Sequence, residues 1–288
     1  MTNVEEMQAE FRPQTRPASA TCIQPSAYLL ELSLDWIVLR ASENAHRLLG
    51  ESHVTLVGEP LGRFVHSEAL HDLRNLFSRL SGTLGIARAY RIRLTDDPDL
   101  FDIAFQLSDG RVLLEAVRSP ERGFGEAFGT VGGLIAGLGD SSGQALLDGG
   151  ARRMRALTGF DRVTLEFGAA RAESSRAALG SATVTAGLPT ILCDAASDGV
   201  AIFPREAEET SAGAALMRSP SPAELEELRG NGIGSALRVP FTAGGEQGEF
   251  RCASRAPHKP GFELHSAAEL FAQLFALRLE IDRLKSGD

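Results

Sequence analysis

Three strand-like stretches that follow one another without a helix between them are the sequence feature that most constrains the fold. Residues 86–94, 101–107 and 112–117 are rich in apolar, β-branched and aromatic residues. The turn Ser108-Asp109-Gly110 joins the last two as a hairpin. Strands with such short connections pair antiparallel, because a parallel pair needs a crossover of about a dozen residues or more. The sequence therefore predicts an antiparallel α+β fold and excludes a nucleotide-binding sheet of alternating strands and helices.

The residues around these strands complete a first unit, which we place at residues 22–119. Before the three strands we expect two more strands, a short helix and an amphipathic helix, over residues 27–33, 36–40, 43–49 and 67–80. Ser42 is suited to begin the short helix and Gly50 to end it. Residues 1–21, which contain prolines and show little periodicity, are predicted to form an extended arm.

A second unit of helices and strands is predicted over residues 126–285. A helix from Ser141 or Ser142 through Leu157 carries an apolar stripe and ends at Gly159. Ser221 and Pro222 are suited to the N-cap and first position of another helix. The stretch after residue 167 is rich in Ala, Gly and Ser and gives only a weak signal. The other predicted elements are strands over 162–167, 190–193, 236–241 and 248–253, and helices over 223–229 and 263–285.

The composition of the 288-residue chain excludes several classes of protein. With 43% apolar and 23% charged residues, the chain can build a core and is not disordered. Its formal net charge of -9 offers no dense basic patch for nucleic acid or an anionic membrane. The start is acidic, and the longest apolar run, over residues 127–139, is shorter than the about 20 residues that a spanning helix needs. We predict a cytoplasmic protein.

The potential catalytic and metal-binding residues follow no recognisable pattern. Cys22, Cys193 and Cys252 are too few and too scattered for a disulfide framework or a zinc site. No Ser/His/Asp or paired-carboxylate arrangement can be assembled from the spacing of the residues. The sequence therefore predicts neither an enzyme nor a metal site.

Four stretches, in the same order along both units, are similar to bacterial phytochromes. Cys22-Ile-Gln-Pro-Ser-Ala-Tyr-Leu-Leu30 resembles the family's Ile-Gln-Pro-His-Gly-x-Leu-Leu motif, and Leu157-Thr-Gly-Phe-Asp-Arg-Val163 resembles the opening of its GAF sheet. Residues 218–232 and 269–280 resemble its pocket helix and its last GAF helix. The resemblance implies a PAS domain followed by a GAF domain, each an antiparallel sheet with flanking helices. It also implies a phytochrome-type knot, with Ile23 as the residue that threads a GAF loop.

Members of this family hold a linear tetrapyrrole, usually biliverdin in bacteria, and this sequence departs from them at the residues that hold it. The thiol that links the bilin in bacterial members lies about ten residues before the Ile-Gln-Pro, where this chain has Phe11-Arg12-Pro13. Cys22 directly precedes Ile23, in a register that the family does not use. The Pro-x-Ser-Asp-Ile-Pro motif is absent, and only about thirty residues separate Asp161 from Asp194.

The family's pocket histidines are also replaced. One falls on Glu224, and the pair after the last strand's Cys252 falls on Ala253 and Ser254. A glutamate at this helix is expected to repel the two propionates of a bilin, which need Arg, His or Ser donors. The candidate chromophore residues are Cys22, Ile23, Glu224, Cys252 and Ser254.

Two functions follow from these departures. The first is a phytochrome-like regulatory module without the usual biliverdin binding, and with no cofactor. The alternative is a red/far-red photoreceptor module that binds biliverdin or another bilin without covalent linkage or through an atypical cysteine. No PHY or histidine kinase domain is present in the sequence, so we expect a signal to pass by contact in trans, unless the sequence is part of a longer chain.

The closing helix carries the clearest indication of a partner. Leucine and isoleucine alternate four and three residues apart, which is the seam of a two-heptad coiled coil: Leu270, Leu274, Leu277, Ile281 and Leu284. Phe271 and Phe275 form a neighbouring stripe. One stripe can pack on the sheet while the other binds a second copy or a different signalling protein, as helices of phytochrome GAF domains do. The other interpretation places both stripes in the core of the chain itself.

Overall fold

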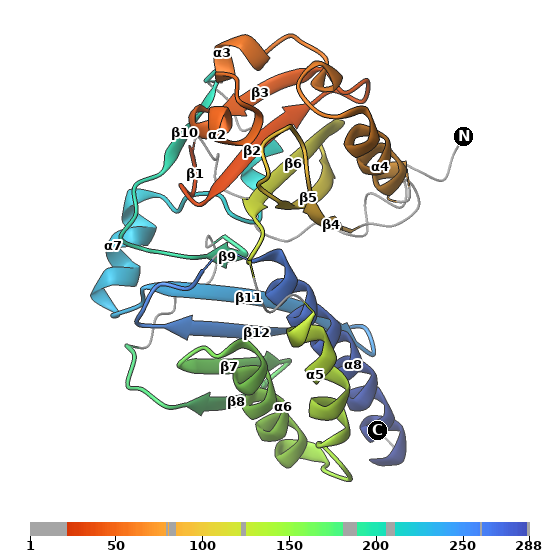
Figure 1. Ribbon diagram of the computed structural model, residues 1–288. Coiled ribbons are helices and arrows are strands. Elements are labelled where there is room, and N and C mark those ends of the chain that lie inside the picture. The colour runs from red at the N-terminus through yellow and green to blue at the C-terminus, as the bar shows by residue number, and fades with distance from the viewer. Residues whose placement is uncertain are drawn as a thin grey trace.

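The computed structural model describes residues 22–78, 80, 85–121, 125–180, 189–205, 211–259 and 261–286. Figure 1 shows two units, one above the other, each built around a sheet. All strand pairs in both sheets are antiparallel, as the sequence predicts. The predicted arm over residues 1–21 lies outside the described residues.

The N-terminal unit contains a sheet that includes a strand from the other unit. The sheet order is β1-β10-β3-β2-β6-β5-β4. Asp109 and Gly110 both have positive φ, as a tight hairpin turn between β5 and β6 requires. The elements of this unit are β1 (Cys22–Ile23), β2 (Ala27–Leu32), β3 (Val38–Ser42), η1 (Glu43–Ala45), α2 (His46–Leu49), α3 (His53–Leu56), η2 (Leu61–Arg63), α4 (Ser67–Ser78), β4 (Ala87–Ile92), β5 (Phe101–Ser108) and β6 (Arg111–Arg118).

The C-terminal unit has three helices on one face of its own sheet, which has the order β8-β7-β12-β11-β9. Helices α5, α6 and α8 lie together in Figure 1, and α8 contacts both of the others. The elements of this unit are α5 (Glu126–Ala136), α6 (Gly143–Thr158), β7 (Arg162–Phe167), β8 (Ala170–Ser175), β9 (Ile191–Leu192), β10 (Val200–Phe203), η4 (Ser211–Ala214), α7 (Pro222–Gly230), β11 (Ser235–Ala243), β12 (Glu246–Ser254) and α8 (Phe262–Ser286).

The two faces of the N-terminal sheet belong to different hydrophobic cores. Leu30, Leu32 and Leu114 pack with the helices of their own unit. On the opposite face, Leu29 and Leu113 belong to the same buried cluster as the C-terminal helices and sheet. Because side chains alternate along a strand, one sheet can serve both cores. The two units therefore share a continuous apolar interface.

Three strands differ from the sequence prediction, and all three are short or on a sheet edge. Strand β8 forms within the stretch that gives only a weak signal in the sequence, because alternate residues such as Ala172 and Ser174 pack inward despite their small size. Strands β1 and β10 were not predicted, since two to four residues carry no periodic signal. Strand β10 completes the other unit's sheet by pairing with β3.

Candidate functional site

The candidate site is the face of the C-terminal sheet opposite helices α6 and α8, where α7 packs and Glu224 lies. Helix α7 begins with a complete capping box: the Ser221 hydroxyl accepts the Glu224 amide, and the Glu224 carboxylate accepts the Ser221 amide at 2.6 Å. Pro222 occupies the first turn. The helix thus begins where the sequence predicts.

Both oxygens of the Glu224 carboxylate have partners within the protein. The oxygen that does not bind the Ser221 amide lies 3.2 Å from the guanidinium of Arg218, and the two side chains are only 15% and 5% exposed. The expected repulsion of a bound propionate is therefore wrong in its geometry, because Arg218 already neutralises this carboxylate. The buried arginine on this face thus has an internal carboxylate partner.

Helix α7 packs directly on the strands beneath it. Leu228 on the helix and Ile233 after it form a small buried cluster, which we call the α7 cluster, with residues of β9, β11 and β12: Leu192, Ala195, Ala236 and Ala253. Ala253, one of the positions where the family has histidine, is thus covered by aliphatic side chains. This part of the sheet is closed by apolar packing.

Farther along the same face, the sheet carries a network of charges, which we call the charged ladder. Arg238 and Arg251 on neighbouring strands both bind Glu249, and Arg251 also binds Glu166 at 3.0 Å. Three of these four side chains are about one third exposed. Covering the ladder with the flat apolar rings of a tetrapyrrole would remove water from several charges at once, which is unfavourable.

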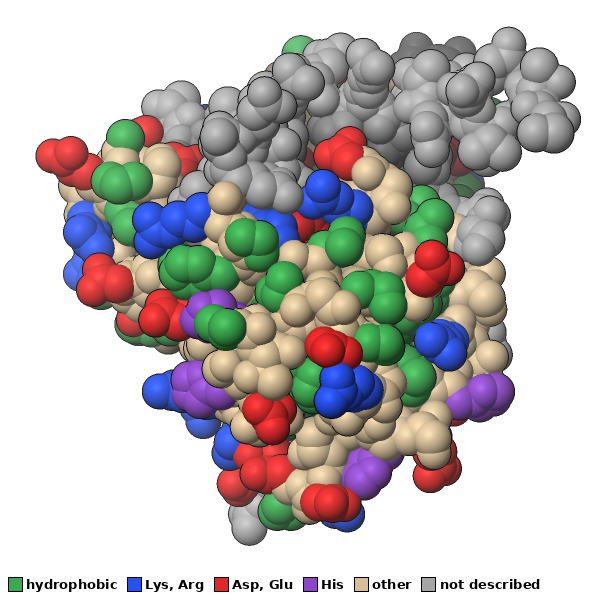
Figure 2. All heavy atoms as spheres, turned by 90° about the horizontal axis from the view of Figure 1, so that it is seen from above, with side chains coloured by type: hydrophobic (Ala, Val, Ile, Leu, Met, Phe, Trp, Pro, Cys, Tyr) green, Lys and Arg blue, Asp and Glu red, His purple; other side chains and the backbone are tan. Residues whose placement is uncertain are grey.

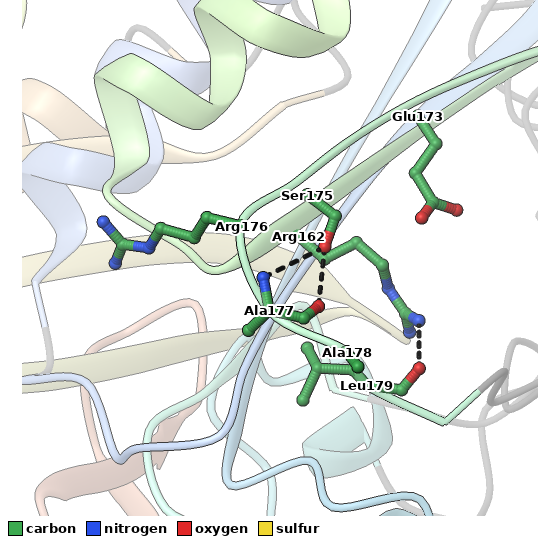
Figure 3. A pocket seen from close by; sticks show the side chains of 7 residues that line it. All are labelled: Arg162, Glu173, Ser175, Arg176, Ala177, Ala178 and Leu179. Carbon is green, nitrogen blue, oxygen red and sulfur yellow. Dashed lines mark hydrogen bonds between the residues drawn. The ribbon is translucent and has the colours of Figure 1, made fainter.

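A shallow cavity of about 390 Å³ lies at the edge of this face, along β7, β8 and the segment that follows them. Figure 3 shows the Arg162 guanidinium bonded to the Leu179 carbonyl, with Glu173 on the other side of Arg162 from residues 177–179. Arg176 points away from these groups and binds Asp161. The cavity therefore has one arginine near one glutamate, and not the two free cationic donors that a pair of propionates needs.

The short segment Cys22–Gln24 lies between two stretches of one C-terminal loop. Ile23 is fully buried, pairs with Val200 of β10 on one side and forms a β-bridge to Arg218 on the other. The buried Gln24 side chain donates to the Ile191 carbonyl at 2.6 Å and accepts the Cys193 amide at 2.8 Å. These contacts place Ile23 where a threaded residue would lie, bracketed by both sides of the loop.

The three thiols have different surroundings. Cys22 is partly exposed beside the loop. Burial raises the pKa of Cys193 and of Cys252 to about 12, so both remain protonated thiols. Cys252 faces α6 and α8 together with Phe250, on the side of the sheet away from α7. The structure thus separates Cys252 from Glu224, which corrects their grouping in one chromophore site.

Ser254 also has a structural environment. Its buried hydroxyl accepts the Asp161 amide at 2.9 Å and lies 3.2 Å from Nε2 of His258. The His258 ring stacks on Phe160 with 4.1 Å between ring centroids, and desolvation lowers its pKa. The described residues contain no cluster of three or more His, Cys, Asp or Glu side chains that could hold a metal ion.

The closing helix separates its two stripes as one interpretation of the sequence predicts. Phe271 and Phe275 are fully buried in the core, and Leu274 packs partly against it. The remaining seam residues are exposed by 38%, 55%, 47% and 80%: Leu270, Leu277, Ile281 and Leu284. No helix in the described part of the chain is long and apolar enough to cross a membrane.

Glu115 and Gln24 are two buried polar residues whose partners the sequence does not indicate. Glu115 lies on β6 and binds the backbone of Leu216 and Met217, about a hundred residues later. A lone glutamate in an otherwise apolar strand was the only signal, and it does not identify the partner. Gln24 belongs to the motif at residues 22–30, but its bonds to Ile191 and Cys193 depend on tertiary structure.

Comparisons with known proteins identify the fold of both units. Residues 15–116 match the family model of the PAS fold. The chromophore-binding domain of Stigmatella aurantiaca phytochrome P1 is 24% identical, with a TM-score of 0.72 over 92% of this chain and 97% of that one. The chromophore-binding domain of an unusual bacteriophytochrome from R. palustris is 22% identical, with a TM-score of 0.71 over 93% and 97%. The Stigmatella aurantiaca photosensory core module matches at 22% identity and TM-score 0.73, over 94% of this chain and 60% of that one. The chain therefore has the PAS-GAF fold of these chromophore-binding domains.

Proposed function

We propose that this PAS-GAF chain is a phytochrome-like regulatory module that has lost the usual biliverdin binding and acts through protein contacts. The PAS unit extends from β1 to β6 and the GAF unit from α5 to α8. The observation that carries the proposal is the buried ion pair between Arg218 and Glu224. Because Arg218 already binds Glu224, its guanidinium is not available to a propionate on the face where α7 packs.

Two further features of the GAF sheet support the loss of bilin binding. The α7 cluster fills the space between Leu228 and the strands, and the charged ladder covers the next rows of the sheet. Neither surface matches the needs of a tetrapyrrole, which combines flat apolar rings with two propionates. The partly exposed Cys22 remains the one thiol that an atypical linkage could use, because Cys193 and Cys252 are buried.

The experiment that tests the proposal is the addition of biliverdin to the purified protein, followed by gel filtration and an absorbance spectrum. We expect free biliverdin to separate from the protein, so that the protein fraction has no red or far-red band. The Cys22→Ser variant serves as the comparison. A band in the wild type that this variant loses would establish the alternative of an atypical linkage and overturn the proposal.

The contact surface in this proposal is the exposed stripe of α8. Leu277, Ile281 and Leu284 project from the C-terminal half of a helix that is bonded to its own domain there, since Asp282 accepts the Gly143 amide at 2.9 Å. A rigid helix with an apolar stripe is suited to pair with a helix of a second copy or of a signalling partner. We propose a homodimer or a heteromeric complex in the cytoplasm, with no catalysis by the chain itself.

The surface of the PAS unit supports a partner other than nucleic acid. Figure 2 shows acidic and basic side chains interspersed on the face seen from above, with hydrophobic side chains between them. Nucleic-acid binding uses a clustered basic surface, because each phosphate contact releases counterions. The net charge of -9 acts against such binding as well.

A further inference from the structure

Glu115 is a carboxylate buried in the joint between the PAS sheet and a GAF segment. It lies on β6 with 1% of its surface exposed. Its Oε2 accepts the Leu216 amide at 2.8 Å, and its Oε1 accepts the Met217 amide at 2.9 Å. Both oxygens are thus engaged by consecutive backbone amides of the other domain.

The segment that Glu115 holds is connected to three other parts of the molecule. The Leu216 carbonyl accepts the amide of Ile191 in the GAF sheet, and the Met217 carbonyl accepts the amide of Gln24. Just before it, the Gln106 side chain of β5 donates to the Ala214 carbonyl at 2.7 Å. A change at Glu115 would therefore affect the PAS sheet, the segment Cys22–Gln24 and the GAF sheet together.

The charge of Glu115 has little compensation in this joint. Arg88 lies in the same row of the sheet, across Ala104 of β5, but its guanidinium binds His265 at 2.7 Å and Glu269 at 2.8 Å. Within the described part of the chain, two backbone amides are thus the direct partners of a carboxylate that is almost fully buried. The charged and titratable groups on the strands of this sheet include Glu31 on β2, which is bound to Arg40 of β3 and Arg111 of β6, Arg88 and Tyr90 on β4, and Asp102 on β5. Those on the other surrounding segments include Arg218 after the segment, Glu224 on α7, and His265 and Glu269 on α8.

We propose that Glu115 makes the PAS–GAF joint sensitive to protons, so that the joint closes more tightly when this carboxyl group is protonated. In the closed joint a charged carboxylate has lost its water, whereas in an opened joint water solvates it. The closed joint therefore binds the proton more tightly than the opened one. By linkage, proton binding favours the closed state, and a rise in pH favours opening.

The direction of the pKa of Glu115 agrees with this geometry. Burial raises it from 4.5 to about 7, although the two backbone amides and Arg88 act to lower it. Opening should therefore become easier as the pH rises between these two values and should level off above the higher one. His265 does not titrate in this window, because burial lowers its pKa to about 3.

The test is hydrogen exchange of the Leu216 and Met217 amides, corrected for the intrinsic pH dependence of exchange. In the wild type we expect protection to fall by more than about tenfold from about pH 5 to about pH 7 and then to remain level. The Glu115→Gln variant cannot titrate, so its protection should be independent of pH. Glu249→Gln, which removes a carboxylate from the charged ladder, should retain the wild-type dependence.

The proposal would be overturned if protection of the Leu216 and Met217 amides did not change with pH in the wild type. It would also be overturned if Glu115→Gln showed the same pH dependence as the wild type. A second measurement does not depend on any variant folding. Carbon-13 NMR of the wild-type glutamate carboxyls should show one group that titrates near pH 7, and its chemical shift should follow the same midpoint as the protection. If all glutamates titrate near their ordinary values, the joint does not bind a proton in the way we propose.

Discussion

The guanidinium of Arg218 lies 3.2 Å from the carboxylate of Glu224, so the face on which α7 packs contains its own counter-ion. Both side chains are mostly buried, and Glu224 also completes the capping box of α7. The carboxylate of Glu224 thus neutralises Arg218 and also caps the N-terminus of α7. The position could be filled by a ligand carboxylate only if this pair were broken.

Replacing Glu224 by alanine should destabilise the protein by about 3 kcal/mol, because it leaves a buried guanidinium unpaired and removes a helix cap. Glu224→Gln should cost less, since glutamine at this position can still accept the Ser221 amide. The measurement is urea denaturation followed by circular dichroism. Glu226→Ala, an exposed position on the same helix, is the control and should change stability by no more than about 0.5 kcal/mol. Equal effects at both positions would show that the pair is not structural.

Replacing Gln24 by leucine should lower the free energy of unfolding by about 2–4 kcal/mol. The change removes the acceptor of the Cys193 amide and the donor to the Ile191 carbonyl, and both groups stay buried without a partner. Thermal unfolding measures the loss. Gln144→Leu is a matched control, because Gln144 makes side-chain bonds on an exposed surface. A stable Gln24→Leu protein would mean that the segment Cys22–Gln24 contributes little to the packing of the loop.

Only one of the three thiols should react quickly with Ellman's reagent in the folded protein. Cys193 and Cys252 are buried, with pKa values raised to about 12, whereas Cys22 is partly exposed. The Cys22→Ser variant should therefore show no fast reaction, and all thiols should react after unfolding in urea. A fast reaction in Cys22→Ser would indicate that the GAF core opens readily.

The Leu277→Glu variant should weaken self-association through α8 by tenfold or more, because it places a charge in the exposed apolar stripe. Sedimentation velocity at several concentrations measures the dissociation constant of the wild type and the variant. Leu107→Glu is the control, since Leu107 is 53% exposed in the PAS unit while Leu277 is 55% exposed. A wild type that is monomeric at all concentrations would leave a different protein as the only partner for the stripe. A dimer that tolerates Leu277→Glu would contradict the contact itself.

The sequence was sufficient to predict most elements of the fold, because periodicity and caps are local. Gly50 and Gly159 adopt the left-handed conformation at the helix ends where they were expected. The burial of Phe271 and the exposure of Leu277 likewise follow from spacing along one helix. These features depend on neighbours within a few residues.

The site was less predictable, because its contacts join distant residues. Cys252 and Ala253 are adjacent in sequence, yet they face opposite sides of the sheet. The partner of Glu224 was not apparent from residue types, and the partners of Glu115 are backbone amides that any sequence would supply. The pairing of β10 with β3 of the other unit could not be predicted either, because the four residues of β10 carry no periodic pattern.

The central claim is that this PAS-GAF chain does not hold a bilin, and co-expression with a haem oxygenase tests it most directly. In that experiment biliverdin is present while the chain folds. A lack of binding therefore cannot result from adding biliverdin only after the protein has folded. The account predicts purified protein with absorbance at 280 nm and no red or far-red band. A red or far-red band that stays with the protein through gel filtration would contradict it.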